Sequence, residues 1–476
     1  MITTSVASNT RKPGTFHEFD ITSAAKGLVP TQRRVALVGA KRSTGTITTL
    51  TPTQVTDEAQ AETLAGQGSE LSLMARKAFG EANHYTRNYG GSPPEIWLVA
   101  TADGTTAAQH TITITGPATA AGDLEIRIAG RTLRCGVASG DSATTIAAAL
   151  TAAIVSKYSD LPVSATSALG VVTLVNRNPG PNGNALKFLT VRYPTGTTVA
   201  YASSVAGAGV YDITTALDSL ADKTYHGVAI ANHLAADVSD LNDYIDAAGA
   251  PGAKRWSIGY LGENGSLSTA TTMATTSNKK EVVIHSIEEC PNLPCEIAVA
   301  TAVAVGCEPD PSRSFDGVEL DLYPPPVTYS PTDTEIETAL AAGTTISVLN
   351  AAQDRVKVVR LVTTKTTENS AVFDRVLDIS NVRVLFAVAT QIDARWLVAF
   401  QRGKNNARTR SRVRSVTLDV LRKCEELEWL QNVDAHLAEL IVETDAVVTT
   451  RLNVSIPQSV VPNLHQLVGK HVLHIE

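Results

Sequence analysis

Three short apolar runs decide the fold class of this chain: His226-Gly-Val-Ala-Ile-Ala231, Arg255-Trp-Ser-Ile-Gly-Tyr260 and Glu281-Val-Val-Ile-His-Ser286. Each run has the length and apolar content of a short strand. The segments between them, residues 237–248 and those after Ser266, have the spacing of helices. Short strands that alternate with helices predict a largely parallel sheet with helices packed on it.

The same alternation continues on both sides of these runs. Residues 34–38 read as a strand, and Ser69 is a good N-cap for a helix with apolar residues at helical spacing. The other predicted elements are helices at 212–220, 295–306, 381–400 and 413–430, and strands at 356–362, 447–456 and 470–475. The predicted fold class is therefore α/β (mixed α+β) and multidomain.

A stretch with few charges interrupts this pattern. Residues 100–210 contain only 12 charged residues in 111 and are rich in Thr, Ala, Gly and Val. Strands are predicted near 111–115, 124–137, 171–175 and 185–193, with a helix that starts at Asp141 as its N-cap. This order predicts a β-rich ββαββ module inserted into the larger domain.

Composition limits the classes of function. The chain has 476 residues, of which 43% are hydrophobic and 18% charged, as expected for about three globular domains. A net charge of −7 argues against packaging of nucleic acid. Aromatic residues, at 5%, are too few for the stacking surfaces that bind carbohydrate or single strands.

The number of cysteines and the hydropathy of the chain indicate the cellular compartment in which the protein is made. Five cysteines, an odd number, argue against a disulfide framework and favour a reducing compartment. Residues 1–12 contain no apolar segment of a signal peptide, and the longest apolar run, 297–307, is shorter than the ~20 residues that span a membrane. We therefore expect a soluble protein made in a cytoplasm, with no direct membrane insertion.

One loop is superficially similar to a phosphate-binding loop. The strand Val35-Ala-Leu-Val-Gly39 is followed by Ala40-Lys-Arg-Ser-Thr-Gly45. A Walker loop needs its Lys and hydroxyl at the start of a helix, but Lys41 comes two residues after Gly39 and no helical pattern follows. A plain turn from strand to loop is favoured over a nucleotide-binding enzyme.

Metal and catalytic motifs are also lacking. Cys290, Cys295 and Cys307 could supply three thiolates, but no fitting fourth ligand stands near them in the sequence. Buried free thiols are favoured over a zinc site. We expect no catalytic residues, no metal and no cofactor.

A dense run of positive charge stands out near the C-terminus. Six cations occur in 13 residues with no acid between them: Arg402, Lys404, Arg408, Arg410, Arg412 and Arg414. One interpretation is a solvated loop that pairs with Glu425, Glu426 and Glu428 of the same or a neighbouring subunit. The other is contact with an acidic surface, for which a protein is favoured over nucleic acid.

An ordered set of short motifs resembles the contractile tail sheath proteins of Mu-like bacteriophages. In order along the chain, these motifs are Thr15-Phe-His-Glu-Phe-Asp20, Val35-Ala-Leu-Val-Gly39, Gly66-Gln-Gly-Ser-Glu-Leu-Ser-Leu-Met-Ala75, Val137-Ala-Ser-Gly-Asp-Ser-Ala-Thr-Thr-Ile-Ala147, Gly170-Val-Val-Thr-Leu174, Gly183-Asn184, Leu440-Ile-Val-Glu443, Arg451-Leu-Asn-Val454, Pro457 and Val472-Leu-His-Ile475. No single motif is specific, but the ordered set covers nearly the whole chain.

The resemblance implies a structural motor and not an enzyme. Such subunits form hexameric rings stacked helically around a tail tube protein, with baseplate and tail terminator proteins as further partners and no nucleic acid bound. Contraction drives the tube through the host envelope for genome ejection. The subunit is then part of the virion and is assembled in the host cytoplasm.

The resemblance also implies terminal arms that add strands to the sheets of neighbouring subunits. Alternating residues at each end of the chain support this, because those strands have no obvious local partner. The candidate arm residues are Phe16, Phe19, Ile21, Val472, Leu473 and Ile475. The candidate contact with the tube consists of Arg408, Arg410, Arg412 and Arg414.

The predicted division of the chain has six parts. They are an N-terminal arm (1–34), the first part of the core (35–99), the inserted module (100–205), the α/β core (206–348), a C-terminal sheath domain (349–464) and a C-terminal β-arm (465–476). Alternative functions are the sheath of a phage-derived bacterial injection system and a non-contractile coat or baseplate protein. An Arg-rich nucleic-acid binder is a further alternative.

Overall fold

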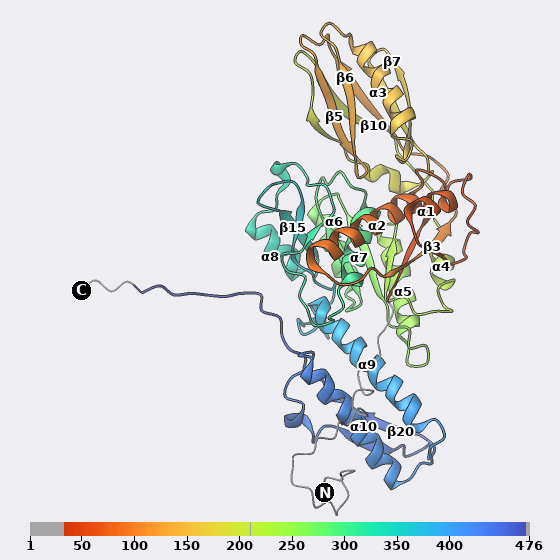
Figure 1. Cartoon of the computed structure of the whole chain (residues 1–476), viewed down its shortest axis with the longest axis vertical. Helices are drawn as coiled ribbons and strands as arrows, with labels where there is room; N and C mark the ends of the chain where they lie inside the picture. Colours follow the sequence, from red (N-terminus) through yellow and green to blue (C-terminus); the bar gives the residue numbers. More distant parts are fainter. Residues whose placement is uncertain (1–32, 210, 473–476) are drawn as a thin grey trace, which may run out of the picture. The chain divides into compact units, whose positions relative to one another are not determined.

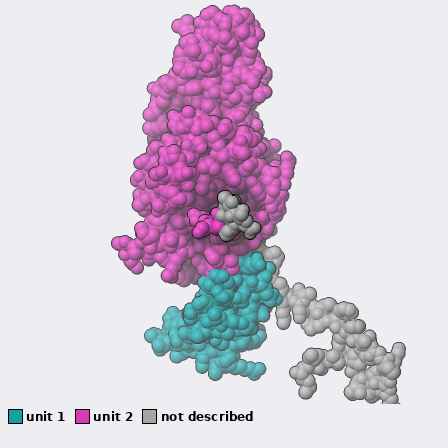
Figure 2. Space-filling view, turned by 90° about the vertical axis from the view of Figure 1, so that its left-hand side faces the viewer, with its two compact units in different colours: residues 1–31, 387–459 teal, residues 32–386, 460–476 magenta. Residues whose placement is uncertain are grey.

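The computed structural model describes residues 33–209 and 211–472. Its described residues form two compact units: unit 1 contains residues 387–459, and unit 2 contains residues 33–386 and 460–472 (Figure 2). The predicted strand at 15–21 lies outside the described residues, as do positions 473–476 of the predicted strand at 470–475. Residues 470–472 are not in a strand.

Unit 2 is built on one nine-stranded sheet with the order β14-β16-β15-β13-β12-β11-β1-β3-β2. The strands are β1 (Arg34–Ala40), β2 (Thr53–Val55), β3 (Glu95–Thr101), β11 (Gly227–Ile230), β12 (Ile258–Glu263), β13 (Val282–Ser286), β14 (Glu319–Leu320), β15 (Thr345–Leu349) and β16 (Val356–Arg360). The six from β3 to β15 run parallel, and β2, β14 and β16 pair antiparallel. The predicted, largely parallel sheet is confirmed.

Helices cover both faces of this sheet (Figure 1). Val35 and Leu37 of β1 pack in one buried cluster with α2 (Glu70–Tyr89) and α7 (Pro294–Cys307). The alternate β1 residues belong to a second cluster with the helices α4 (Ile213–Asp218), α5 (Ala235–Gly249) and α6 (Leu267–Ser277). Helices α1 (Glu58–Ala65) and α8 (Asp333–Ala341) complete the unit. Burial of both faces explains why its strands are apolar runs without polar alternation.

Side-chain caps fix where several of these helices start. Ser69 accepts a hydrogen bond from the backbone N–H of Ser72, at 3.0 Å. Asp212 and Ser266 make the same bond at the starts of α4 and α6. Each cap satisfies one N–H that the first helical turn leaves without a partner. The predicted N-cap Ser69 is confirmed.

The inserted module follows β3 and consists of two small sheets and one helix (Figure 1). Its elements are β4 (Gln109–Thr115), β5 (Gly122–Ile128), β6 (Arg131–Val137), α3 (Ala143–Lys157), β7 (Val163–Ala168), β8 (Val171–Asn176), β9 (Leu189–Arg192) and β10 (Thr198–Val205). The predicted strand at 124–137 is a hairpin, because Ala129 and Gly130 turn the chain with positive φ. The N-cap of α3 is Ser142, not Asp141.

Within residues 387–459, unit 1 contains two α-helices, a short 3-10 helix (Asp434–His436) and one small sheet. Helix α9 (Ile379–Phe400) begins in unit 2, and α10 (Ala407–Glu426) is followed by β19 (Ile441–Thr444) and β20 (Leu452–Ser455). Helix α10 starts six residues before the predicted 413, so Arg408–Arg414 are helical and not in a loop. The predicted strand at 447–456 is only β20, because residues 445–451 form its turn.

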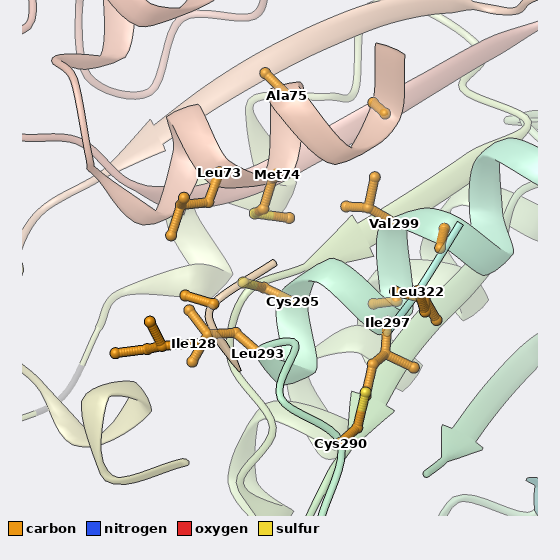
Figure 3. Close-up of a cluster of buried hydrophobic side chains, with 14 of the residues drawn as sticks. Leu73, Met74, Ala75, Ile128, Cys290, Leu293, Cys295, Ile297, Val299 and Leu322 are labelled. Carbon is orange, nitrogen blue, oxygen red and sulfur yellow. The ribbon is translucent and has the colours of Figure 1, made fainter. Parts of the chain in front are cut away.

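Helix α7 packs against β12 at a position where only glycine fits. Figure 3 shows Cys295, Ile297 and Val299 of α7 beside Met74 of α2, within the buried cluster. On the sheet side, a Cβ at Gly262 would stand 2.0 Å from the carbonyl oxygen of Pro294. Backbone atoms cannot yield as a flexible side chain can, so the helix has to move away from the sheet.

We expect Gly262→Ala to lower the free energy of unfolding by about 3 kcal/mol, the upper part of the range for overpacked cores. Gly249→Ala is the matched control, because a Cβ at this exposed last residue of α5 meets nothing within 4 Å. Urea unfolding of both variants measures the difference. Equal midpoints for the two would show that α7 does not press on β12 at this point.

Candidate functional site

The basic segment, Arg402 to Arg414, lies at the start of α10. Arg402 and Lys404 are exposed in the turn before the helix, and Asn406 caps α10 by accepting a hydrogen bond from Thr409 N–H at 2.9 Å. Four-residue spacing on a helix places Arg408 with Arg412 on one face. It places Arg410 with Arg414 on another, so the helix divides the run into two pairs.

Arg410 and Arg414 bind the segment that leads into β19. Arg414 donates from Nε to the carbonyl of Leu440 at 3.0 Å and from Nη2 to the carbonyl of Leu437 at 2.7 Å. Arg410 donates from Nη1 to Thr444 Oγ1 at 3.2 Å. These two arginines therefore fasten the small sheet of unit 1 to α10.

Arg408 and Arg412 are exposed, and Arg412 lies over the ring of Phe400, 5.6 Å from its centre. Among the described residues, none of the six cations of the basic segment forms an ion pair. Glu425 accepts from the N–H of Val433, and Glu426 pairs with Lys423. Within the subunit, the predicted pairing with Glu425–Glu428 is therefore wrong for these two glutamates.

The sheet formed by β19 and β20 contains only these two strands among the residues described. Asp445 closes its turn by accepting from the N–H groups of Val447 and Val448 and by pairing with Arg451. These bonds hold the pKa of the Asp445 carboxyl below its ordinary value. Among the strands of residues 33–209 and 211–472, each of these two has one edge with no neighbour, which is the arrangement that accepts an added strand.

Of the candidate arm residues, only Val472 lies within the described part of the chain. Phe16, Phe19, Ile21, Leu473 and Ile475 lie outside the described residues, so the structure does not test their role. Val472 is described, and its side chain is 62% exposed. Upstream of it, the tail also exposes the apolar side chains of Leu464, Leu467 and Val468.

The loop at Gly39–Gly45 lies where β1 separates strands β3 and β11, and in parallel sheets such a point often holds a ligand. Here Asn178 of the module fills it. The Asn178 amide donates to the carbonyl of Lys41 at 3.0 Å and to Asp103 at 2.6 Å, and its oxygen accepts from Glu70 N–H at 3.0 Å. Lys41 itself donates to the carbonyl of Ile47 at 2.6 Å. The prediction of a plain turn is confirmed.

Glu70 lies beside this point, buried at the first residue of α2. Burial raises its pKa to about 7, although Tyr211 and Asn182 donate to its carboxylate at 3.0 and 3.3 Å. The cavity here has a volume of only 10 Å³ and is lined by Asn176 and His233, among others. That is room for about one water molecule, not for a nucleotide.

Two further possibilities are a metal site formed by the cysteines and a membrane span formed by one of the helices. Cys290, Cys295 and Cys307 are free and buried, as predicted, and burial raises the pKa of each thiol. Within 33–209 and 211–472, no group of three or more metal-ligating side chains gathers. No helix in that part of the chain has the length and apolarity to span a membrane.

Comparisons with known proteins identify the class to which this architecture corresponds. No family model matches the chain. It is 28% identical over 363 residues to the Mu-like prophage FluMu tail sheath protein of Haemophilus influenzae, across 73% of this chain and 71% of that protein. This relative confirms the resemblance to Mu-like tail sheath proteins.

Solved structures agree on the fold. A sheath tail protein from Desulfitobacterium hafniense superposes with a TM-score of 0.50 over 90% of this chain and 93% of that chain, at 13% identity. A chain of the anti-feeding prophage baseplate superposes with a TM-score of 0.51 over 98% of this chain and 100% of that chain, at 9% sequence identity. The mixed α/β fold of sheath proteins is thus confirmed, and the curated relative supports a structural sheath subunit.

We expect Arg410→Ala with Arg414→Ala to loosen β19 without unfolding unit 2. Hydrogen bonds from charged donors contribute about 1.5–3 kcal/mol each, and less when exposed, so local opening should become roughly tenfold more frequent. Hydrogen exchange of residues 437–444 measures this. The matched control is Arg408→Ala with Arg412→Ala, and the same loss of protection in that variant would contradict the division of the run into two pairs.

Proposed function

We propose that this chain is the subunit of a contractile phage tail sheath that assembles as hexameric rings stacked helically around a tail tube. The observation that carries the proposal is the similarity to the Mu-like tail sheath protein, which extends over 363 residues. Contraction would drive the tube through the host envelope. The subunit would then belong to the virion, after assembly in the host cytoplasm.

The open edges of β19 and β20 support the exchange of arms between subunits. A strand added to either edge would pair with the backbone N–H and C=O groups along it, and main-chain pairing tolerates many sequences. The N-terminal arm with Phe16, Phe19 and Ile21, and the C-terminal arm with Val472, Leu473 and Ile475, are the proposed donors. Donor and acceptor are different surfaces, and a repeated head-to-tail contact of this kind builds rings or helical arrays.

The exposed pair Arg408 and Arg412, with Arg402 and Lys404, is the proposed contact with the tube. Arg408 lies in the first turn of α10, where the helix dipole makes a positive charge unfavourable. An acidic partner surface would remove that cost. Each pair would be weak and screened by salt, but the contacts would add up around a ring.

Contraction of such a sheath requires no bound cofactor or hydrolysis. It needs a free-energy difference between two packings of each subunit, summed over the array. The proposed subunit is accordingly a structural protein and not an enzyme, with baseplate and tail terminator proteins as further partners.

A second candidate is the sheath of a bacterial contractile injection system. The fold similarity to a chain of the anti-feeding prophage baseplate favours it. A non-contractile coat or baseplate protein would keep the arms but form no long tubes.

Electron microscopy tests the proposal. We expect the purified full chain to form tubular lattices, and deletion of residues 1–21 or 467–476 to yield folded monomers that form none. Circular dichroism is the control for folding. A full-length chain that stays monomeric at high concentration would sink the proposal, and a truncation that unfolds the chain would show that the deleted arm pairs within its own subunit.

We expect Arg408→Glu with Arg412→Glu to form empty sheaths that do not assemble on a tube, because the reversed charge repels an acidic tube surface. The control Arg408→Lys with Arg412→Lys keeps the charge and should co-assemble. Electron microscopy of subunits mixed with tube counts filled and empty sheaths. Loss of all polymerisation in the glutamate variant would assign the pair to the sheath lattice instead.

A further inference from the structure

Two side chains of the C-terminal tail, two positions apart in the sequence, bond to side chains of unit 2. Asn463 donates from Nδ2 to Ser380 Oγ at 2.6 Å. His465 contacts Asp316 through Nδ1 and Asp378 through Nε2, the latter at 3.0 Å. Past this point the tail is exposed: Leu467 is 86% and Val468 92% accessible to solvent.

The geometry around His465 requires a charged ring. Both ring nitrogens face carboxylate oxygens, and a neutral imidazole has only one N–H, so its other nitrogen would face an acceptor without a proton between them. An imidazolium donates from both nitrogens. Only 22% of the His465 side chain is exposed, so solvent cannot easily replace either partner.

One of the two carboxylates, that of Asp378, is held in place by a second side chain besides His465. Asp378, just before α9, accepts two hydrogen bonds from Arg360 of β16, at 2.7 and 3.0 Å. Asp316 comes from the loop before β14, and Asp374 is a further acid near Arg360. Without His465, one arginine would face three acids, so the site has a deficit of positive charge that a charged histidine reduces.

We propose that His465 is the anchor at which the C-terminal arm leaves its own subunit, so that residues 460–465 stay on unit 2 and only the residues after His465 are exchanged. This rests on the proposed function, and it divides the predicted arm at its first residue. The eleven residues from Gln466 to Glu476 can span roughly 36 Å when extended. The neighbour's acceptor edge must then lie within that reach.

The anchor depends on pH in a defined direction. Hydrogen bonds and charge from Asp316 and Asp378 raise the pKa of His465 above its ordinary 6.5, against the opposing effect of burial. A raised pKa stabilises the docked tail fully below pH 6.5, and the effect is lost as the pH rises through the raised value. The pKa of Asp378 is lowered, so its contribution is lost only in acid.

A spin label on the full chain tests the anchor in the unassembled subunit. All five cysteines are buried, so Gln466→Cys provides the one exposed thiol within the described residues. We expect the spin label to be immobilised at about pH 6 and to rotate several-fold faster at about pH 9. His465→Gln should be fast at both pH values. His471→Gln, an exposed histidine of the same tail, should behave as the parent, and a label that is fast in all variants at both pH values would overturn the anchor.

A covalent tether tests where the exchanged arm begins. Ser380→Cys with Asn463→Cys joins the tail to its own unit and leaves His465 intact. We expect the oxidised, internally linked chain still to form tubular lattices, because the residues after the anchor remain free. Polymerisation that occurs only in the reduced form would overturn the proposal, since the whole tail would then be exchanged. Failure of the reduced form as well would count against the sheath function and leave the spin-label result to decide the anchor.

Discussion

Every residue of α7 is buried, and the core of unit 2 depends on how the polar groups at the two ends of this helix are satisfied. At its start, Glu296 accepts from the backbone of Leu293 at 3.0 Å and pairs with Arg76. At its end, carbonyls that would otherwise be buried without donors receive arginine side chains. Arg33 donates to the carbonyl of Gly306 at 3.3 Å, and Arg383 donates to that of Glu308 at 2.7 Å.

These same bonds decide where the chain can leave unit 2. Arg33 directly precedes β1, and Arg383 lies in the part of α9 that belongs to unit 2. Arg383 is buried deeply enough that its pKa falls to about 10, so it cannot be withdrawn without exposing a buried helix end. A subunit that rotates or exchanges arms has to move outside such anchors, and His465 occupies the corresponding position on the C-terminal tail.

The elements that the sequence predicts well are those whose signal is local. Ser69 marks its helix because a cap acts within three residues, and the parallel strands are apolar because both faces are covered. The β5–β6 hairpin was missed although the apolar alternation changes phase across the turn at Ala129 and Gly130, from even-numbered positions in β5 to odd-numbered positions in β6. The start of α10 was missed because residues 407–412 contain no apolar stripe. Because the sequence did not show that these residues are helical, it could not show that Arg410 and Arg414 lie on a different face from Arg408 and Arg412. The partners of His465 stand 87 and 149 residues away, beyond any local pattern.

The inserted module contributes to filling the position at which sheets of this topology usually bind a ligand. Strand order reverses at β1, and in other parallel sheets the helix start beside such a point binds an anionic ligand. In this chain the first N–H of α2 is taken by Asn178, and the carboxylate of Glu70 occupies the place of the anion. Asn178 of the module and Glu70 of α2 itself therefore supply from within the chain the groups that a ligand would supply from outside.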